Sequence, residues 1–416
     1  MKVLHEAGVI IIGGGHAGGR TAERLRAFGY KEPITIIGRE PHLPYERPPL
    51  SKAVLTDLNV RSTPELLTAE RWEELDIILI CGTTCGSINI QAKSVHLSDG
   101  RVLPYTQLVL AMGLTPRGLP NLGAIKEHVY TLHTYDDAMA LREHLKPGAR
   151  VGIVGAGFIG LEVAASARTL GAEVTIIEMA ERPLSRVFNS TMSDWFVQLH
   201  RHHGASLMCA KTIADVTSEN GAATLNLDDG QNLEFDLVVT GIGGDPNIEL
   251  AQAADLKIDN GIVVNRKCQT SAPDVYAVGD IANMLDERTG TTQRLESWKY
   301  AEDTAAVVAH VLCDQDGAYD HVPWFWTDQF EHNIQIVGQL QEGATVFARG
   351  KPGDPKYLAY YLDADMLLGA VGLDCGGDLR RARAAMEKKT PITAKILAKM
   401  GLAPIHARPE SPVAVS

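Results

Sequence analysis

Residues 9–18 read VIIIGGGHAG, an apolar strand that runs directly into Gly13-x-Gly15-x-x-Gly18. The first glycine permits a tight turn, the second lets the backbone approach a pyrophosphate, and the third allows the next helix to pack against the strand. The N-terminus of that helix points its N–H groups at the phosphates. Residues 20–26 continue as an amphipathic helix and residues 33–37 as a second strand. The stretch therefore predicts a βαβ unit that binds a dinucleotide.

The same pattern recurs at residues 150–162, which read RVGIVGAGFIGLE and contain Gly155-x-Gly157-x-x-Gly160. The next strand ends at Glu178, eighteen positions later (178 − 160), close to the ~20 expected for a ribose-binding acid. A carboxylate there accepts hydrogen bonds from both ribose hydroxyls and repels a 2′-phosphate, so NADH is expected over NADPH. A single copy is a weak signal, whereas two copies in the same context are much stronger.

A later stretch, residues 270–280, reads as a turn and a strand that end at Gly279-Asp280. Asp280 could hydrogen-bond a ribityl or pyrophosphate group near a helix dipole. It could equally be a plain helix cap, and from these residues alone the cap is favoured.

Composition restricts the function classes. The chain has 416 residues and a net charge of −12, which argues against a general binder of nucleic acid or anionic membranes. The sequence has no apolar run of the roughly 18 residues that a membrane-spanning helix needs, so we expect a cytoplasmic protein. The six cysteines are scattered without a Cys-x-x-Cys pair, and we expect reduced thiols and no metal site.

Together these residues resemble the two-nucleotide flavoprotein reductases, above all the ferredoxin reductases of bacterial oxygenase systems, with rubredoxin reductase and apoptosis-inducing factor as relatives. The resemblance covers nearly the whole chain. It is carried by PYERPPLSK (44–52), IGLE (159–162), GIG (241–243), YAVGD (276–280) and PWFWTDQ (323–329).

The resemblance implies an α/β fold with two Rossmann-like domains, FAD in the first and NADH in the second, and a small C-terminal α/β domain. We expect the FAD domain at 1–117 and 246–322, the NAD domain at 118–245, and the last domain at 323–416 with a frayed tail from about 403.

The same resemblance implies roles for single residues. Lys52 would lie beside flavin N5, paired with Glu162, where its charge stabilises the reduced flavin; taken alone, it would be a solvated surface lysine. Trp324 and Trp326 would lie where electrons leave, or would equally form a small aromatic core.

The other expected site residues divide between the two nucleotides. Those for FAD are Gly13, Gly15, His16, Ala17, Gly18, Arg39, Glu40, Arg47, Lys52, Cys85, His133, Asp280 and Trp298. Those for NAD are Gly155, Gly157, Phe158, Ile159, Gly160, Glu162, Glu178 and Gly243.

Two of these positions depart from the family pattern. Arg39 replaces a common acid, which makes Glu40 the candidate for the FAD ribose. His133 replaces a common arginine, so its charge is expected to be weaker or pH-dependent.

Disulfide reductases of this fold carry a redox cysteine pair where this chain has Arg47-Pro48-Pro49-Leu50, and no cysteine precedes Cys81. The electrons are therefore expected to leave for something other than a protein thiol. The resemblance implies that the acceptor is a [2Fe–2S] ferredoxin that feeds an aromatic-ring dioxygenase or a P450. The alternatives are a rubredoxin-, quinone- or monodehydroascorbate-type reductase, or an NADH-sensing flavoprotein of the apoptosis-inducing-factor type.

Residues 379–399 carry seven basic side chains against one acid, Glu387, a net charge of +6. They could steer an acidic ferredoxin, although a solvated helix face is at least as common for such a segment. The basic residues are Arg380, Arg381, Arg383, Lys388, Lys389, Lys395 and Lys399.

Overall fold

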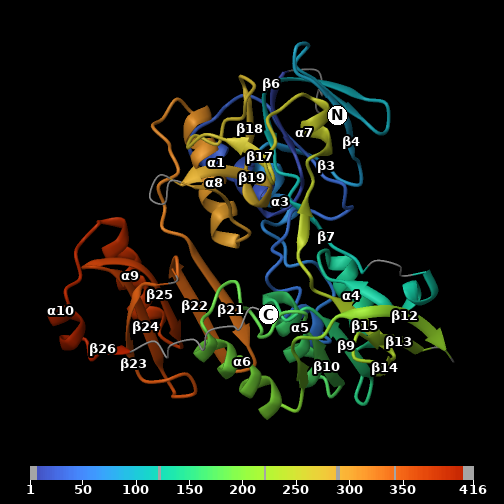
Figure 1. The fold of residues 1–416 in the computed structure, drawn as a ribbon. Coiled ribbons are helices and arrows are strands. Elements are labelled where there is room, and N and C mark those ends of the chain that lie inside the picture. Colours follow the sequence, from blue (N-terminus) through green and yellow to red (C-terminus); the bar gives the residue numbers. More distant parts are fainter. Residues whose placement is uncertain (1–6, 120–122, 220–221, 287–290, 342, 406–416) are drawn as a thin grey trace. The chain divides into compact units, whose positions relative to one another are not determined.

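The computed structural model describes residues 7–119, 123–219, 222–286, 291–341 and 343–405 (Figure 1). Its contacts divide the chain into two compact units: residues 1–174 with 213–320, and residues 175–212 with 321–416. The three-domain organisation stays a prediction, because this division places parts of 118–245 in both units. No helix among the described residues is both long and apolar enough to span a bilayer.

The first glycine turn (residues 13–18) follows the central strand of a seven-stranded sheet in the first unit. The strand order is β3-β2-β1-β6-β5-β4, with β18 also paired to β6. Strand β1 is buried along its whole length and pairs in parallel with β2, Val9 opposite Ile34. The bounds are β1 Gly8–Ile12, β2 Ile34–Ile37, β3 Ile77–Ile80, β4 Cys85–Asn89, β5 Ser94–Leu97, β6 Val102–Leu110 and β18 Val275–Ala277.

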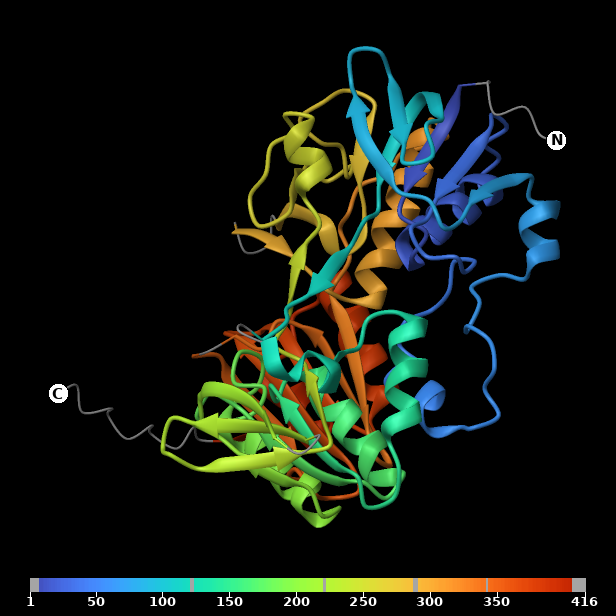
Figure 2. The ribbon, with the colours of Figure 1, turned by 90° about the vertical axis from the view of Figure 1, so that its right-hand side faces the viewer.

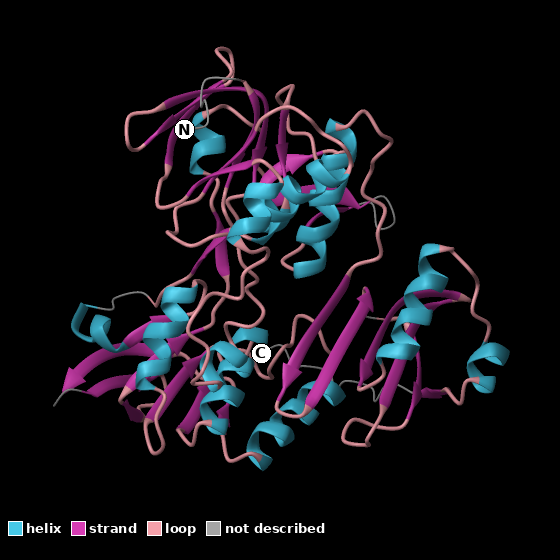
Figure 3. Cartoon of the chain, turned by 180° about the vertical axis from the view of Figure 1, so that it is seen from behind, coloured by secondary structure: helices cyan, strands magenta, loops and turns pink. Residues whose placement is uncertain are grey.

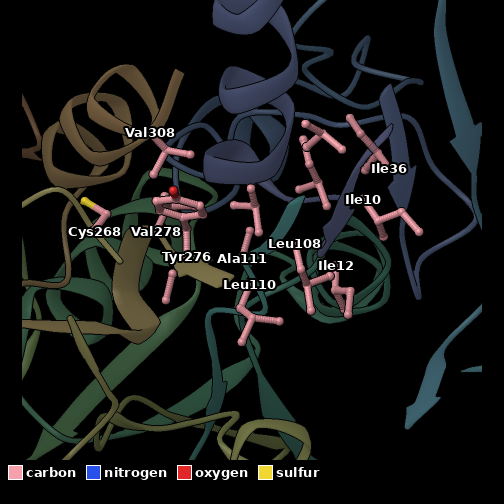
Figure 4. Close-up of a cluster of buried hydrophobic side chains, with 14 of the residues drawn as sticks. Ile10, Ile12, Ile36, Leu108, Leu110, Ala111, Cys268, Tyr276, Val278 and Val308 are labelled. Carbon is pink, nitrogen blue, oxygen red and sulfur yellow. The ribbon is translucent and has the colours of Figure 1, made fainter. Parts of the chain in front are cut away.

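Two helices far apart in sequence, α1 (His16–Ala27) and α8 (Trp298–Leu312), lie side by side in this unit (Figures 1 and 2). Figure 4 shows the apolar core of the unit, where Ile10, Leu108 and Tyr276 from three neighbouring strands gather. Because both faces of the parallel strands are covered, these strands are continuous apolar runs instead of alternating ones.

The second glycine turn (residues 155–160) also lies in the first unit, between β9 (Arg150–Val154) and α5 (Phe158–Thr169). Strand β15 pairs in parallel with both β9 and β8. The remaining elements of this unit are β7 Leu114–Pro116, η1 Gly123–His128, β8 Val129–Thr131, α2 Ala53–Thr56, α3 Ala69–Glu74, α4 Tyr135–His144, β12 Ile213–Glu219, β13 Ala222–Leu227, β14 Asn232–Phe235, β15 Leu237–Thr240, β16 Gly244–Pro246, α7 Glu249–Ala253, β17 Ile262–Val264, η2 Gly279–Ile281, β19 Ala282–Asp286 and β20 Thr291–Arg294.

The second unit contains an antiparallel sheet of order β21-β22-β25-β24-β23-β26, on which α9 packs (Figure 3). Its bounds are β21 Trp324–Gln329, β22 His332–Gly338, β23 Thr345–Arg349, β24 Tyr357–Asp363, β25 Met366–Leu373, β26 Ala403–Ile405, α9 Gly376–Glu387 and α10 Ala394–Lys399. The unit also holds α6 (Ser190–His202) and the parallel pair of β10 (Glu173–Ile177) with β11 (Ser206–Met208).

The parallel sheets and the smaller antiparallel sheet confirm the predicted α/β class. The tail expected to fray from about 403 begins instead with a strand, since backbone pairing of Val346 with Ile405 holds β26 on β23. Residues 406–416 lie outside the described residues.

Candidate cofactor and electron-transfer site

The first glycine turn has the shape that a pyrophosphate requires. Gly13 has a φ of +119°, and a Cβ there would collide with the carbonyl oxygen of Ala111. A Cβ on Gly18 would collide with the carbonyl of Gly13, so helix and strand touch at this point. At Gly15, by contrast, a Cβ would meet only Nη2 of Arg47, 3.7 Å away. The turn is therefore closed on the protein side and open where a phosphate would approach.

The helix after this turn suits an anion. Gly15 is the N-cap residue of α1, no side chain caps it, and the first turn has no acidic residue. The N-terminal partial positive charge of the helix is thus left for a ligand. These features fit the diphosphate of FAD.

Glu40 and Arg47 meet beside this turn. Nη2 of Arg47 donates to Oε1 of Glu40 at 3.0 Å, and the Tyr45 hydroxyl donates to Oε2 of Glu40 at 2.5 Å. Nη1 of Arg47 donates to the backbone carbonyl of His133. Burial, together with the charges of Arg47 and Arg39, lowers the pKa of His133 to about 3. His133 is therefore uncharged near neutral pH, which agrees with the expected weaker charge and not with a pH-dependent one.

A cluster around the buried pair His16 and Glu302 joins α1 to α8. Nε2 of His16 lies 2.9 Å from Oε1 of Glu302, and Nη2 of Arg24 donates to the other carboxylate oxygen at 3.0 Å. Arg20 forms a second arginine ion pair with Glu302 at 2.5 Å. The His16 and Trp298 rings lie 5.2 Å apart between centroids. Glu302 is not among the residues expected from sequence, since nothing local distinguishes an acid in an amphipathic helix.

Asp280 lies within the 3₁₀ turn η2, whose N-cap residue is Val278, so a plain helix cap does not describe it. Nη1 of Arg294 donates to the Asp280 carbonyl at 2.9 Å, and Nη2 of Arg294 pairs with Glu296 at 2.8 Å. Burial and the nearby charge of Glu296 raise the pKa of Asp280 to about 7, against the opposing charges of Arg47 and Arg294. Arg294 is a second residue that sequence reasoning missed.

Cys85 begins β4, and its thiol donates to the Ser87 carbonyl at 3.4 Å. Burial raises the pKa of this thiol to about 11, so it stays protonated near neutral pH. The preceding loop is tied to Glu40, whose carbonyl accepts from the Gly82 N–H at 2.9 Å. A role of Cys85 at FAD stays a prediction. The six cysteines are unpaired, and no cluster of metal ligands occurs among the described residues.

The second glycine turn repeats the first. Gly155 has a φ of +100°, and a Cβ on Gly160 would collide with the Gly155 carbonyl. At Gly157, the N-cap residue of α5, a Cβ would meet only the Gly241 carbonyl, 3.7 Å away. No side chain caps α5. The expected NAD residues Phe158 and Ile159 form its first turn, and Ile159 is exposed.

Two further residues expected at NAD adjoin strands, Gly243 just before β16 and Glu178 just after β10. Gly243 has a φ of +92° and faces the guanidinium of Arg117. In the second unit, Oε1 of Glu178 accepts from the Ala180 N–H at 2.8 Å. The nearby Arg182 donates to Ser193 Oγ at 3.0 Å and to the Phe188 carbonyl. Its guanidinium is thus engaged by its own loop and by α6.

Lys52 and Glu162 form an ion pair in the first unit, with 2.7 Å between Nζ and Oε2. Glu162 is buried and Lys52 is half-buried. Five positions before Lys52, Arg47 faces the first glycine turn, and five positions before Glu162 stands Gly157 of the second. The solvated lysine considered from sequence alone is therefore replaced by a half-buried lysine that is paired with a buried carboxylate.

Trp324 and Trp326 stack in β21, with 5.0 Å between centroids and 21° between planes. Their indole N–H groups donate to Gln335 and Asp328, each at 3.2 Å. Both rings are half-buried. An electron-transfer role stays a prediction.

The basic stretch 379–399 is partly neutralised. Asp378, just before it, pairs with Arg381 at 2.5 Å and Arg349 at 2.6 Å. Glu387 pairs with Arg383 at 2.8 Å. Arg380 is exposed and forms no ion pair within the described part of the chain.

Comparisons with known proteins agree over most of the chain. Residues 7–305 match the family model described as pyridine nucleotide-disulphide oxidoreductase, and residues 324–403 match the one described as reductase C-terminal. The chain is 38% identical over 378 residues to the anthranilate 1,2-dioxygenase system ferredoxin–NAD(+) reductase component of Burkholderia cepacia, covering 90% of this chain and 92% of the relative. It is 34% identical over 396 residues to putidaredoxin reductase of Pseudomonas putida, covering 94% of each.

Solved structures give the same picture. The covalent putidaredoxin reductase–putidaredoxin complex matches with a TM-score of 0.89 at 34% identity, over 94% of this chain and 96% of that one. The ferredoxin reductase for the CYP199A2 system from Rhodopseudomonas palustris matches with a TM-score of 0.90 at 34% identity, over 95% of this chain and 100% of that one.

Proposed function

We propose that this chain, which belongs to the pyridine nucleotide-disulphide oxidoreductase family, is an NADH-dependent flavoprotein that reduces a [2Fe–2S] ferredoxin serving an oxygenase. The names of its relatives imply use of a flavin and NAD(H). The FAD is noncovalent and belongs to the first glycine turn, and NADH belongs to the second.

The Lys52–Glu162 pair carries this proposal. The segment from Arg47 to Lys52 runs from the open face of Gly15 to the helix that begins at Gly157. A lysine held between two nucleotide sites can stabilise negative charge that develops where the nucleotides meet. When bound, FAD would accept a hydride from NADH and release the two electrons singly.

The other residues bind and orient. The N-termini of α1 and α5 hold the two diphosphates, and Arg47 adds a charge at the first. Glu178 accepts hydrogen bonds from the adenosine ribose of NADH. Its position disfavours a 2′-phosphate, because Glu178 is anionic and Arg182 is engaged elsewhere.

A ferredoxin is supported as the acceptor in two ways. Two relatives, 38% and 34% identical over nearly their whole length, are named as a ferredoxin–NAD(+) reductase component and as putidaredoxin reductase. In addition, the first cysteine is Cys81, outside the segment 47–50 where disulfide reductases carry theirs. We place the electron exit at Trp324 and Trp326, and the docking charge at Arg380.

Anaerobic stopped-flow mixing tests the proposal. The FAD-loaded protein should bleach faster with NADH than with NADPH, and a [2Fe–2S] ferredoxin should then restore the flavin colour faster than a rubredoxin. Lys52→Met should slow bleaching by about 10- to 100-fold. Slow bleaching to a long-lived charge-transfer complex would contradict the reductase and support the NADH-sensing alternative.

A further inference from the structure

Ser51 and Lys52 donate hydrogen bonds to the same carboxylate oxygen of Glu162. The Ser51 hydroxyl donates to Oε2 of Glu162 at 2.5 Å, and the same Oε2 accepts from Nζ of Lys52 at 2.7 Å. The Lys52 ammonium also donates to the Pro48 carbonyl at 3.1 Å. Ser51 is only 2% exposed. Because solvent does not reach it, its bond to Glu162 is a fixed part of the protein and not a surface contact.

Ser166 binds the same segment through its backbone. It lies four positions after Glu162 on α5, and positions four apart share a helix face. Its hydroxyl donates to the backbone carbonyl of Ser51 at 2.6 Å, and Ser166 is buried. Helix α5 therefore holds Ser51 by its side chain through Glu162 and by its backbone through Ser166.

Arg142 of α4 holds the continuation of this segment. Its Nη1 donates to the carbonyls of Val54, Asp57 and Val60 at 3.1, 3.3 and 3.0 Å. The residue is only 8% exposed. A buried guanidinium is costly unless its hydrogen bonds are made, and here one of its nitrogens faces three carbonyls that follow Lys52.

We propose that Ser51 and Ser166 are positioning residues that fix the Lys52–Glu162 pair, with Arg142 anchoring the residues that follow. The inference rests on the proposed function, in which that pair acts at the flavin. The side chain of a lysine is long and flexible. When the Ser51 hydroxyl holds Oε2 of Glu162 in place, the Lys52 ammonium that donates to the same oxygen has one preferred position. Misplacement of a catalytic group by about 1 Å can cost on the order of a hundredfold in rate.

A double-mutant cycle tests the link between Ser51 and Glu162. Ser51→Ala should slow flavin reduction at saturating NADH about tenfold, with an unchanged NADH dissociation constant and a shifted FAD midpoint potential. In a Glu162→Gln background the same substitution should have little further effect, because residues that act as a unit are not additive. Full additivity, or an unchanged rate and potential in Ser51→Ala, would overturn the inference.

A second measurement needs neither turnover nor flavin. In the FAD-free protein, Ser166→Ala should speed amide hydrogen exchange in residues 51–56, because it frees the Ser51 carbonyl. Thr169→Ala is the matched control: its hydroxyl, on the same helix, bonds the Ala165 carbonyl of its own helix at 2.9 Å. Equal amide exchange of residues 51–56 in the two variants would contradict the role of Ser166 in holding this segment. If Ser51→Ala does not fold, Ser166→Ala takes its place in the cycle.

The outcomes separate the two proposals. If Glu162→Gln leaves flavin reduction unchanged, the role proposed for the Lys52–Glu162 pair fails, and the positioning role fails with it. If Glu162→Gln slows reduction and Ser51→Ala does not, only the positioning role fails.

Discussion

His16 and Glu302, 286 positions apart in the chain, share a hydrogen bond of 2.9 Å in the buried contact of α1 with α8. Burial by itself would raise the pKa of Glu302. The hydrogen bonds from His16 and Arg24 and the charge of Arg20 outweigh burial and hold this pKa at about 2. One carboxylate thus ties the helix of the first glycine turn to the last helix of its unit.

We expect Glu302→Gln to lower the free energy of unfolding at pH 7 by about 2–3 kcal/mol. The pKa of Glu302 is depressed in the folded protein, so the stability it gives is present above its ordinary pKa and is lost as the pH falls towards about 2. The gap between wild type and variant should therefore close with falling pH. Urea unfolding between pH 7 and pH 3 measures this difference in the free energy of unfolding. Glu23→Gln serves as the partly exposed control. A difference that does not change with pH would refute the depressed pKa of Glu302.

A second prediction concerns Asp280, whose pKa of about 7 is raised by burial. A raised pKa means that the carboxylate becomes charged in the folded protein as the pH rises through about 7. Its charge then repels a diphosphate, so FAD should bind several-fold more weakly at pH 8 than at pH 6. Fluorescence titration of FAD-free protein measures the change. Asp280→Asn should abolish it, and His133→Gln should not, since the pKa of His133 is about 3.

The coenzyme preference gives a third prediction. Glu178→Gln should raise the KM for NADH about tenfold, because a charged acceptor for the ribose is lost. It should not create a good NADPH enzyme, since Arg182 remains bonded to Ser193 and the Phe188 carbonyl. Steady-state kinetics with both coenzymes decide this, with exposed Glu181→Gln as control. A variant that prefers NADPH would show that Arg182 is available after all.

A fourth prediction tests ferredoxin docking. Arg380→Glu should slow ferredoxin reduction several-fold at low ionic strength and much less at high salt, because steering by exposed charges is screened. Reduction of the flavin by NADH should be unaffected. Lys267→Glu changes the net charge equally at another exposed position and serves as control. An equal effect of both variants would show that only overall charge matters.

The local elements could be predicted closely from sequence. The expected strand at 33–37 is β2, Ile34–Ile37, and the expected helix at 20–26 lies within α1, His16–Ala27. These predictions hold because glycine conformations and apolar spacing act between near neighbours. The start of the tail, expected at about 403, could not be placed from composition, which does not reveal that β23 offers an edge for Ala403–Ile405.

By itself, the sequence determined two glycine turns with their strands and helices, and the acid at 178, since each depends on residues within about 25 positions of one another. Only the tertiary structure decided that Ser51 and Lys52 meet Glu162, that Glu302 meets His16, and that Arg294 holds Asp280. It also decided the charges: His133 is neutral and Asp280 titrates near pH 7. The physical reason is that burial and distant partners set these properties, and both exist only once the chain has folded.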